Sequence, residues 1–584
     1  MWQVIAQSEL PGRRLIDLDT KASEHQIMQT VPYRSNQQAR TKLPSPRPLR
    51  YLMAAVFMLA ATVASADGNK DAFDSFQATD MTPWTPEVIQ AIDAYVLAPN
   101  FNDGRFGLDH FAASNSLDQQ GLVTARLANG NMVVAGLVPD GVGGGFCGDG
   151  TKLCSIGLVR YNDSGQRIAW PNAGENGRFT NNYVVWPAGS SEFYRSQYLR
   201  HVSVRGNLID VLVDQPDLTR SGLGRADVVI ATFRDNGEFV GFNTVFGSSG
   251  SGSEGEDFYG AQMVQMSSTT MIVAATAYDS FGSFIAVTRL LTNANQTPTK
   301  DANWGVPYNP APNSFYANRL NRYFAPGSYC GAASCDATAG YVAKPEGSSF
   351  ADFYVAGNLH ISGNNWDPVA LKISSESGSV KTEFNVTGWS RAIFDDTNST
   401  LKDLVAGLYV YQDDVYMAAQ VARKCHNGIG LAKLNGATGG YLTAFGSVGK
   451  ILFGGQGDSL ACIAGNQAAV PLAISATGGR IGIAGYQALG GFGGGAIQVD
   501  PMLAVVDAVN GSLLSFDNYP VRRTDGTRYG DGVLYGIYGG TSPTSPFTVS
   551  GNGRDESASN TLSYVSGRLI PVSSDRIFAN GFNN

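Results

Sequence analysis

NGNMVVAG (residues 129–136) and IGLVRYNDSG (residues 156–165) are the clearest copy of a two-part phrase that returns six times after residue 120. Each part is a short apolar run beside a Gly-containing turn. A unit of this size cannot bury its apolar face alone, so the repetition indicates an array of equivalent modules. Intervals of 77, 63, 81, 62 and 66 residues separate the ends of the first parts, which are Gly136, Val213, Thr276, Gly357, Ala419 and Gly485. Each interval fits one four-stranded sheet with loops of variable length.

Both parts of the phrase are predicted strands that enter tight hairpins, because β-branched and aliphatic residues dominate them. Five turns offer the positive-φ positions that such hairpins need: Ala128-Asn129-Gly130, Arg205-Gly206-Asn207, Asp235-Asn236-Gly237, Ser377-Gly378 and Asn510-Gly511. Between the two parts the loops are long, as in residues 137–154 and 486–500. We therefore expect short turns at one end of each sheet and long loops at the other. Binding is expected on the long-loop face.

The composition fits one folded β domain. The chain has 584 residues with 70 Gly, 15% charged and 43% hydrophobic residues, whereas a disordered chain would carry more charge and less apolar material. Two or three separate domains are the alternative. Repeats that run from about residue 120 to residue 520 favour a single radial array.

We predict an all-β fold, a β-propeller of about seven four-stranded blades, with six blades as the alternative. Residues 561–573, with a Ser566-Gly567 turn, are predicted as a last hairpin. This hairpin could pair with an N-terminal strand, so that the two termini close the last blade and remove exposed edges. Residues 83–97 are predicted as a short helix that covers one end of the array.

The N-terminus has the pattern of a secretory signal. Arg47 and Arg50 precede an apolar run over residues 51–63, and Ala64-Ser65-Ala66 ends it, which predicts cleavage before Asp67. A signal anchor is the alternative, although the run is short for a membrane span. The predicted division is residues 1–66 as extension and signal peptide, 67–118 as lead-in segment, 119–573 as propeller and 574–584 as C-terminal tail. We expect a secreted or cell-envelope protein.

Six cysteines follow the predicted signal, which suits an exported protein. Proximity predicts three disulfides, the first two of them bridging long loops: Cys147–Cys154, Cys330–Cys335 and Cys425–Cys462. The two close pairs lack C-x-x-C spacing, and no His lies near them in a zinc-like pattern. No metal is predicted.

Charge argues against nucleic acid as a partner. The first 66 residues hold eight Lys/Arg and four Asp/Glu, so the remaining chain has 33 basic and 45 acidic residues and a net charge of −12. We expect a monomer, an extracellular ligand or surface polymer as partner, and no stable membrane span after signal cleavage.

The repeat phrase resembles the delta-sixty repeat of secreted bacterial proteins. VTARLANGNMVVAG and IGLVRYNDSG carry the likeness, together with FGSSG (residues 246–250) and FGSVG (residues 445–449) in later copies. The resemblance covers most of residues 104–515 by pattern, and it implies propeller blades in proteins that mostly lack an assigned activity. DRIFANGF (residues 575–582) also resembles an I-F-x-x-G-F tail at the ends of exported bacterial proteins.

A second resemblance points to a different class. KLNGATGGYL (residues 433–442) and VVDAVNGSLL (residues 505–514) are similar to a phrase of quinoprotein propellers, which bind pyrroloquinoline quinone. The docking Trp of that phrase is absent, with Thr443 and Ser515 next in line, and the chain has no adjacent pair of Cys residues. We therefore predict no cofactor.

Polar and aromatic side chains of the long loops form the candidate binding set, because a propeller would gather them around one mouth of its axis. They are Asp214, Asp217, Tyr278, Asp279, His360, Trp366, Asp367, Arg423, His426 and Asp500. Such residues could bind a sugar or a cation. The alternative for any one of them is a turn cap, a role that Asp and Asn often take.

Two functions remain open. The favoured one is a binding or interaction module whose ligand is a carbohydrate or another extracellular polymer, because no catalytic signature stands out in the sequence. The alternative is an extracellular hydrolase or lyase whose acid and base are carboxylates from different blades. No catalytic residue is assigned for it.

Overall fold

The computed structural model describes most of the chain after residue 92. It describes residues 93–102, 105–109, 120–140, 153–171, 178–181, 198–216, 226–247, 257–279, 282–308, 318–332, 334–345, 352–363, 365–394, 402–422, 427–454, 468–489, 498–522, 528–540, 545–555 and 561–573. All of these belong to the unit Trp84–Asn584. The predicted signal peptide and C-terminal tail lie outside the described residues.

Strands pair in chain order into four-stranded blades. Blade 1 contains β3 (Gln120–Arg126), β4 (Met132–Asp140), β5 (Leu153–Tyr161) and β6 (Arg178–Asn181). Blade 2 contains β7 (Tyr198–Arg205), β8 (Leu208–Pro216), β9 (Ala226–Arg234) and β10 (Phe239–Phe246). Blade 3 contains β11 (Asp257–Gln265), β12 (Thr270–Asp279) and β13 (Gly282–Asn293), whose outer edge pairs with both β14 (Gln296–Lys300) and β16 (Asn318–Tyr323). β15 (Val306–Tyr308) adds to β16.

The next three blades repeat this pattern. Blade 4 contains β19 (Ala337–Ala343), β20 (Phe353–Ser362), β21 (Asn365–Ile373) and β22 (Trp389–Arg391). Blade 5 contains β23 (Asp403–Tyr411), β24 (Asp414–Ala422), β25 (Asn427–Asn435) and β26 (Lys450–Phe453). Blade 6 contains β27 (Ala468–Thr477), β28 (Arg480–Leu489), β29 (Gln498–Asp507) and β30 (Leu513–Asn518). Short elements between blades are β17 (Ala325–Pro326), β18 (Ser334–Cys335), the 3-10 helix η4 (Gly327–Tyr329), β31 (Val521–Arg522) and β32 (Arg528–Gly530).

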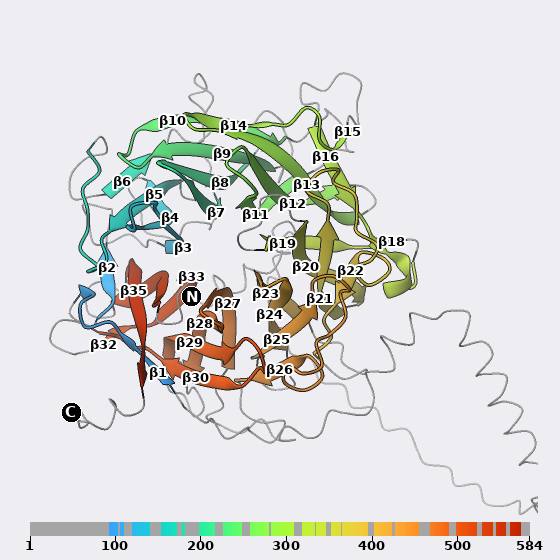
Figure 1. Ribbon diagram of the computed structural model, residues 1–584. Coiled ribbons are helices and arrows are strands. Elements are labelled where there is room, and N and C mark those ends of the chain that lie inside the picture. Colours follow the sequence, from blue (N-terminus) through green and yellow to red (C-terminus); the bar gives the residue numbers. More distant parts are fainter. Residues whose placement is uncertain are drawn as a thin grey trace, which may run out of the picture. The chain divides into compact units, whose positions relative to one another are not determined.

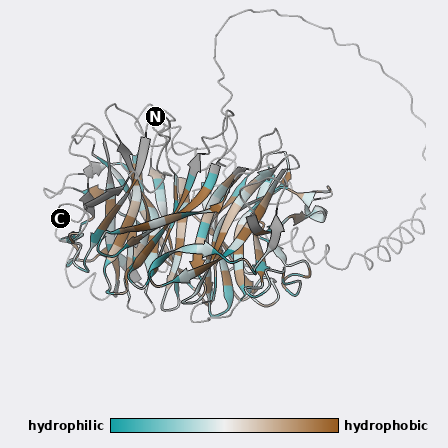
Figure 2. Cartoon of the chain, turned by 90° about the horizontal axis from the view of Figure 1, so that it is seen from above, coloured by the Kyte–Doolittle hydropathy of each residue, from teal (hydrophilic) through white to brown (hydrophobic). Residues whose placement is uncertain are grey.

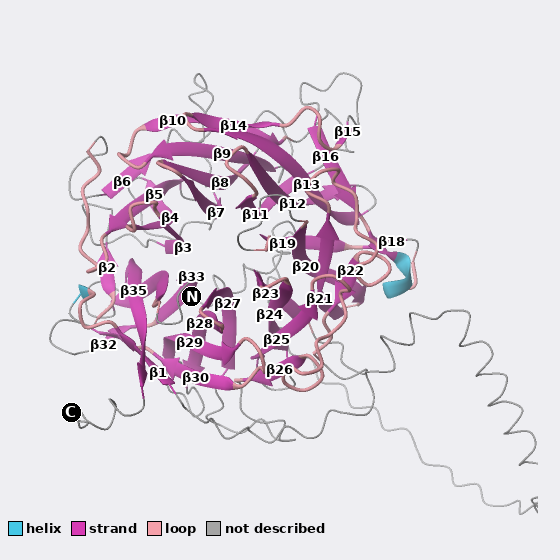
Figure 3. Cartoon of the chain, viewed as in Figure 1, coloured by secondary structure: helices cyan, strands magenta, loops and turns pink. Residues whose placement is uncertain are grey.

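Both ends of the described chain build blade 7. Its first three strands from the axis outward are β33 (Gly532–Gly539), β34 (Phe547–Asp555) and β35 (Thr561–Ser573). The outer edge of β35 pairs with β1 (Asp93–Leu97) and, further along, with β2 (Gly107–Asp109). The inner strands β3, β7, β11, β19, β23, β27 and β33 contact one another in turn around a closed ring (Figure 1). The predicted seven-bladed, all-β propeller is confirmed, and so is its closure by strands from the two ends (Figure 3).

Two local predictions at the closure are wrong. Residues 93–97 form a strand instead of the end of a helix, because the free edge of β35 offers them a ladder of backbone partners. Residues 83–92 of the predicted helix lie outside the described residues. Ser566 and Gly567 lie in the middle of β35 instead of in a turn, since they pair with Ser550 and Val549 of β34.

Apolar side chains fill the seven junctions between blades. A separate buried cluster lies at each junction, from the one that joins blades 1 and 2 to the one that joins blades 7 and 1. Figure 2 shows the apolar residues running along the strands. Because each sheet is covered on both faces, its central strands read as continuous apolar runs such as MVVAG, which explains the repeat phrase.

The predicted hairpin turns contain the expected glycines in the left-handed region. The φ angles are 88° at Gly130, 59° at Gly206, 90° at Gly237, 71° at Gly378 and 78° at Gly511. A side chain is strained in this region, so glycine at these positions lets the two strands reverse tightly.

The predicted contrast between two ends of the blades is correct only in part. In blade 2, Gly206-Asn207 joins the first two strands, and the loop to the third strand covers residues 217–225. Blade 4 shows the opposite, because residues 344–352 join β19 to β20 while residues 363–364 join β20 to β21. Gly363, at φ 55°, permits that tight turn. The two faces therefore do not divide into one short-turn and one long-loop surface all the way around.

Each of the seven inner strands carries a β-bulge at the same level. The register shifts lie between Gly121 and Val123 and at the equivalent points of the other strands, so the inserted residues are Leu122, Arg200, Ala261, Gly340, Ala406, Leu472 and Tyr535. A bulge bends its strand and increases its twist. Seven equivalent bulges thus bend the inner strand of every blade at the same level.

A Lys or Arg of each blade reaches the outer part of the next blade, and we call these contacts the cation ties. Four come from strand positions that match Arg160 of the repeat phrase, and each donates to a main-chain oxygen: Arg160 to Asp235 (2.6 Å), Arg289 to Ser375 (2.9 Å), Lys372 to Gly436 (2.8 Å) and Lys433 to Ala508 (2.8 Å). Arg568 makes the same tie from blade 7 to the Asp163 oxygen of blade 1, at 3.0 Å.

The two remaining junctions use substitutes. Thr232 and Val505 stand at the matching positions, and neither can reach across. At the junction of blades 2 and 3, Arg205 donates to the main-chain oxygens of Asn293 and Gln296 instead. At the junction of blades 6 and 7, Arg480 donates to the Tyr95 hydroxyl at 3.1 Å. All seven junctions of the described ring therefore have a tie.

Lys433 illustrates what a tie contributes. Its ammonium is nearly buried, lies 3.2 Å from Asp414 and shares the Ala508 oxygen with the Tyr416 hydroxyl. We predict that Lys433→Met lowers the free energy of unfolding by about 1–3 kcal/mol, because Asp414 loses its partner at a mostly buried site. Chemical denaturation followed by tryptophan fluorescence measures the change.

Arg234→Met is the matched control for this prediction. Arg234 also ends a third strand, but it pairs with Glu238 of its own blade at the surface. Its loss should change stability by less than about 0.5 kcal/mol. Equal losses in the two variants would contradict a special role for the tie.

Candidate functional site

Polar side chains link three inner strands just beyond their bulges. The Val342 N–H donates to Gln262 Oε1 at 2.8 Å, which orients the amide so that its NH₂ faces His201 Nε2 at 3.0 Å. His201 Nε2 therefore accepts, and the ring is neutral with its proton on Nδ1. This chain of contacts connects blades 4, 3 and 2.

Asp214 is a predicted site residue that contacts the inner strands of two blades. Its carboxylate is 1% exposed, accepts from Arg200 Nε at 2.6 Å and accepts from the Gly260 N–H of the next inner strand at 2.6 Å. Burial raises the pKa of the Asp214 carboxyl, while Arg200 and the Gly260 N–H act to lower it. The Asp214 carboxylate thus links blade 2 to blade 3, and almost none of it is open to solvent.

Tyr341 links blade 4 to blade 6, because its hydroxyl donates to the Leu472 oxygen at 3.4 Å. Five of the seven bulge residues are apolar aliphatic residues or glycine, and the other two are Arg200 and Tyr535. Arg200 is the one charged residue among the seven, and it pairs with Asp214.

His360 and Trp366 are the predicted site residues that the structure brings together. They pair across β20 and β21, and their ring centroids are 4.7 Å apart. His360 Nδ1 lies 3.9 Å from the Asp336 carboxylate, which also accepts from the Ser283 N–H at 2.8 Å. Asp336 follows the predicted Cys330–Cys335 disulfide, which is present.

The other described candidates belong to separate blades. Asp367 is fully buried and pairs with Arg391, Asp500 is buried and accepts from Gln498 at 2.9 Å, and Tyr278 packs edge-on against Tyr259. Asp214, Asp367 and Asp500 lie in blades 2, 4 and 6, which are not neighbours. Asp217, Arg423, His426 and the side chain of Asp279 lie outside the described residues, as do the side chains needed for Cys147–Cys154 and Cys425–Cys462.

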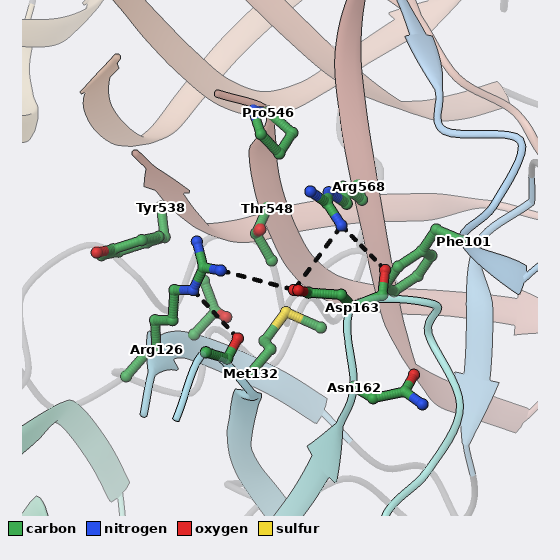
Figure 4. Close-up of a pocket in the computed structure, with 12 residues that line it drawn as sticks. Phe101, Arg126, Met132, Asn162, Asp163, Tyr538, Pro546, Thr548 and Arg568 are labelled. Atoms are coloured by element: carbon green, nitrogen blue, oxygen red, sulfur yellow. Dashed lines mark hydrogen bonds and ion pairs between the residues drawn. The ribbon is translucent and has the colours of Figure 1, made fainter. Parts of the chain in front are cut away.

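A pocket opens where blade 7 meets blade 1, and we call it the seam pocket. It has an internal volume of about 20 Å³, and its walls include Phe101, Arg126, Asp163, Tyr538 and Arg568. One water needs about 10–15 Å³, so the pocket admits a small chemical group. Figure 4 shows Arg126 and Arg568 approaching the Asp163 carboxylate from two sides.

The repeat phrase itself positions Asp163. In the turn of NDSG, the Asn162 side chain accepts from the main-chain N–H groups of Ser164 (3.0 Å) and Gln166 (2.9 Å). Gly165 has φ 76°, and a Cβ there would lie 2.9 Å from the Phe101 ring. The turn is therefore fixed on both sides, and Asp163 is held at its tip.

The two arginines of the seam pocket are held by main-chain oxygens. Arg126 Nε donates to the Gly130 oxygen at 3.1 Å, and Arg568 Nη1 donates to the Asp163 oxygen at 3.0 Å. Their distances to the Asp163 carboxylate are longer, at 3.6 Å and 3.7 Å. The side chains are 39% exposed for Arg126, 23% for Arg568 and 67% for Asp163.

Sequence reasoning missed the seam pocket. Its residues lie at the ends of hairpins on the face opposite to the predicted one, and they come from opposite ends of the chain. A repeated Lys or Arg at the position of Arg160 was a signal available in the sequence, but Arg568 lies beyond the clear copies of the phrase. Only the closure of blade 7 brings it to Asp163.

Other kinds of site find no support among the described residues. No group of three His, Cys, Asp or Glu side chains in that part of the chain could hold a metal ion. No helix within the described ranges is long and apolar enough to cross a membrane.

Comparison with known proteins shows distant likeness in architecture. No family model matches the chain, and no curated protein does. A solved ulvan lyase, a polysaccharide lyase, aligns with a TM-score of 0.37 and 9% identity over 69% of this chain and 82% of its own. The polysaccharide lyase Uly1 aligns with a TM-score of 0.38 and 8% identity over 82% and 99%. A glycosyl hydrolase from Bacteroides ovatus aligns with a TM-score of 0.25 and 14% identity over 62% and 93%.

Nothing about ligand or reaction follows from likeness at these values. The class of the protein, a seven-bladed β-propeller, rests on the sheets described above.

His201 gives a test of the neutral contact chain. Burial lowers the pKa of His201 to about 4 from 6.5. Between pH 4 and pH 6.5, His201 binds a proton in the unfolded chain but not in the folded chain. The free energy of unfolding therefore falls as the pH drops from 6.5 to 4, by up to about 3 kcal/mol. We predict that His201→Gln, whose amide oxygen can still accept from Gln262, removes the part of the decrease in unfolding free energy at acid pH that comes from His201. Unfolding free energies at a series of pH values measure it.

His360→Gln is the control, since that ring is partly exposed beside Asp336. The control should show the same decrease in unfolding free energy at acid pH as the wild type. An unchanged pH profile in His201→Gln would show that His201 is not held neutral.

Proposed function

We propose that this chain is a secreted or cell-surface β-propeller that binds an extracellular polymer, with carbohydrate as the expected class, and that it carries out no chemistry. The observation that supports it is the seam pocket. Arg126, Tyr538 and Asp163 line this pocket and are each more than a third exposed, and two guanidinium groups are held by main-chain oxygens. Such prearranged polar groups beside an aromatic ring suit the recognition of a polar ligand.

The catalytic alternative has less support among the described residues. It needs two carboxylates near one another, one of them with a raised pKa and both open to substrate. Asp214 and Asp210 both have a raised pKa, but they are 1% and 0% exposed and are bonded to Arg200 and Arg205. Asp367 and Asp500 lie in other blades and are also buried. A hydrolase or lyase would have to draw its acid and base from elsewhere.

Export and family remain part of the proposal. The signal pattern before Asp67 and the Cys330–Cys335 disulfide both suit an oxidising compartment outside the cytoplasm. Membership of the delta-sixty repeat proteins rests on the resemblance of the repeat phrase and stays a proposal. The absence of a cofactor is likewise an expectation.

A glycan and polymer array tests the proposal, followed by affinity measurement on the polymers that bind. We predict that Arg126→Ala weakens binding about tenfold, because a ligand loses one of two charged contacts. Arg234→Ala, also at a strand end, should leave the affinity unchanged. Absence of binding above background across the array, or equal affinity in Arg126→Ala and the wild type, would contradict the proposal.

A further inference from the structure

We propose that the seam pocket recognises a carboxylate or sulfate group of its polymer, and that this group takes the place of the Asp163 carboxylate between Arg126 and Arg568. This inference rests on the proposed binding function and names its ligand class. The free volume of about 20 Å³ is that of about one water, so the group needs the space that the Asp163 carboxylate leaves. The rest of a polymer would lie over Tyr538 and the exposed turn.

The Asp163 contacts are longer than those of five other arginine–carboxylate pairs among the described residues, which are 3.2 Å or shorter. Arg289 lies 2.7 Å from Asp301, whose side chain is 5% exposed, and Arg200 lies 2.6 Å from the buried Asp214. Asp163 is 67% exposed and lies 3.6 Å and 3.7 Å from its two arginines. Tight charge-assisted bonds are about 2.7–2.9 Å long. The Asp163 pairs are loose and solvated, so a ligand anion can replace them at small cost.

The arginines do not depend on the Asp163 side chain for their positions. Arg568 is held by the main-chain oxygen of Asp163, and Arg126 is held by the oxygen of Gly130. The Asp163 carboxylate can therefore move out to solvent while both guanidinium groups stay in place. Two cations then face one site, which favours a planar carboxylate or a tetrahedral sulfate over a neutral hydroxyl.

Binding at this site also acts on the closure of the ring. Arg126 belongs to blade 1 and Arg568 to blade 7, the two blades that the ends of the described chain bring together. An anion that contacts both arginines adds a bond across the seam. Because such a ligand binds the closed ring only, it stabilises β1 and β35 against opening.

The experiment compares trigalacturonate with galactotriose, its neutral counterpart, on the full chain and two variants. Asp163→Asn removes the competing carboxylate but keeps the main-chain oxygen that anchors Arg568. Asp235→Asn is the matched control, because Asp235 holds the same place in the next repeat and its oxygen accepts from Arg160. Affinities are measured at low and moderate salt, and hydrogen exchange follows residues 93–97 and 561–573.

Trigalacturonate should bind with an affinity that falls as salt rises, and galactotriose should not bind. Asp163→Asn should bind trigalacturonate about three- to tenfold more tightly, and Asp235→Asn as tightly as the wild type. Bound trigalacturonate should slow exchange in β1 and β35.

The possible outcomes distinguish failure of the anion site from failure of the proposed polymer-binding function. Equal binding of both sugars, or weaker binding by Asp163→Asn, would overturn the anion site while leaving a polymer-binding propeller in place. Binding of trigalacturonate without slower exchange in β1 and β35 would overturn the link to closure. A chain that binds no polymer on the array would refute the function itself.

Discussion

A cation that donates across each blade junction is the interaction on which the rest of this structure depends. Four-stranded sheets in a ring bury apolar faces against one another, and burial alone is non-directional. The cation ties add direction, because each one fixes a point on one blade to the hairpin end of the next blade. The accepting oxygens of Asp163, Ser375 and Gly436 lie three residues beyond Arg160, Lys372 and Lys433. Each repeat therefore both gives and receives a tie.

The same constraint places the seam pocket. At most junctions the cation is nearly buried, as with Arg160 and Lys433. At the seam, Arg568 is 23% exposed and a second arginine, Arg126, stands across from it. At the junction that closes the ring, a tie therefore meets solvent with a second arginine beside it. Arg568 both ties blade 7 to blade 1 and lines the proposed binding site, so a ligand bound there can influence the closure of the ring.

Much of the fold followed from the sequence because its causes are local. Gly130, Gly206 and Gly237 lie in turns that need positive φ, and the continuous apolar runs reflect strands covered on both faces. The strand at residues 93–97 was missed because it forms only when β35 supplies its partner edge. The short connections after Asp279 and Ser362 were missed for a similar reason, since loop length varies among the repeats.

The candidate site could not be found in this way. Asp214 and Asp367 fit the pattern of exposed loop carboxylates, but Arg200 and Arg391 bury them in ion pairs that no repeat pattern reveals. Among the candidates whose side chains the structure describes, His360 and Trp366 came together across two paired strands, because one hairpin carries both. The seam pocket needs residues about 400 positions apart, and their meeting depends on ring closure.

Hydrogen exchange of Arg568→Met tests the central claim most directly. If the cation tie holds the seam, this variant should exchange faster in β1, β35 and the facing strand β4, while β24 of blade 5 exchanges as in the wild type. Unchanged protection at the seam, or an equal loss of protection around the whole ring, would contradict the account.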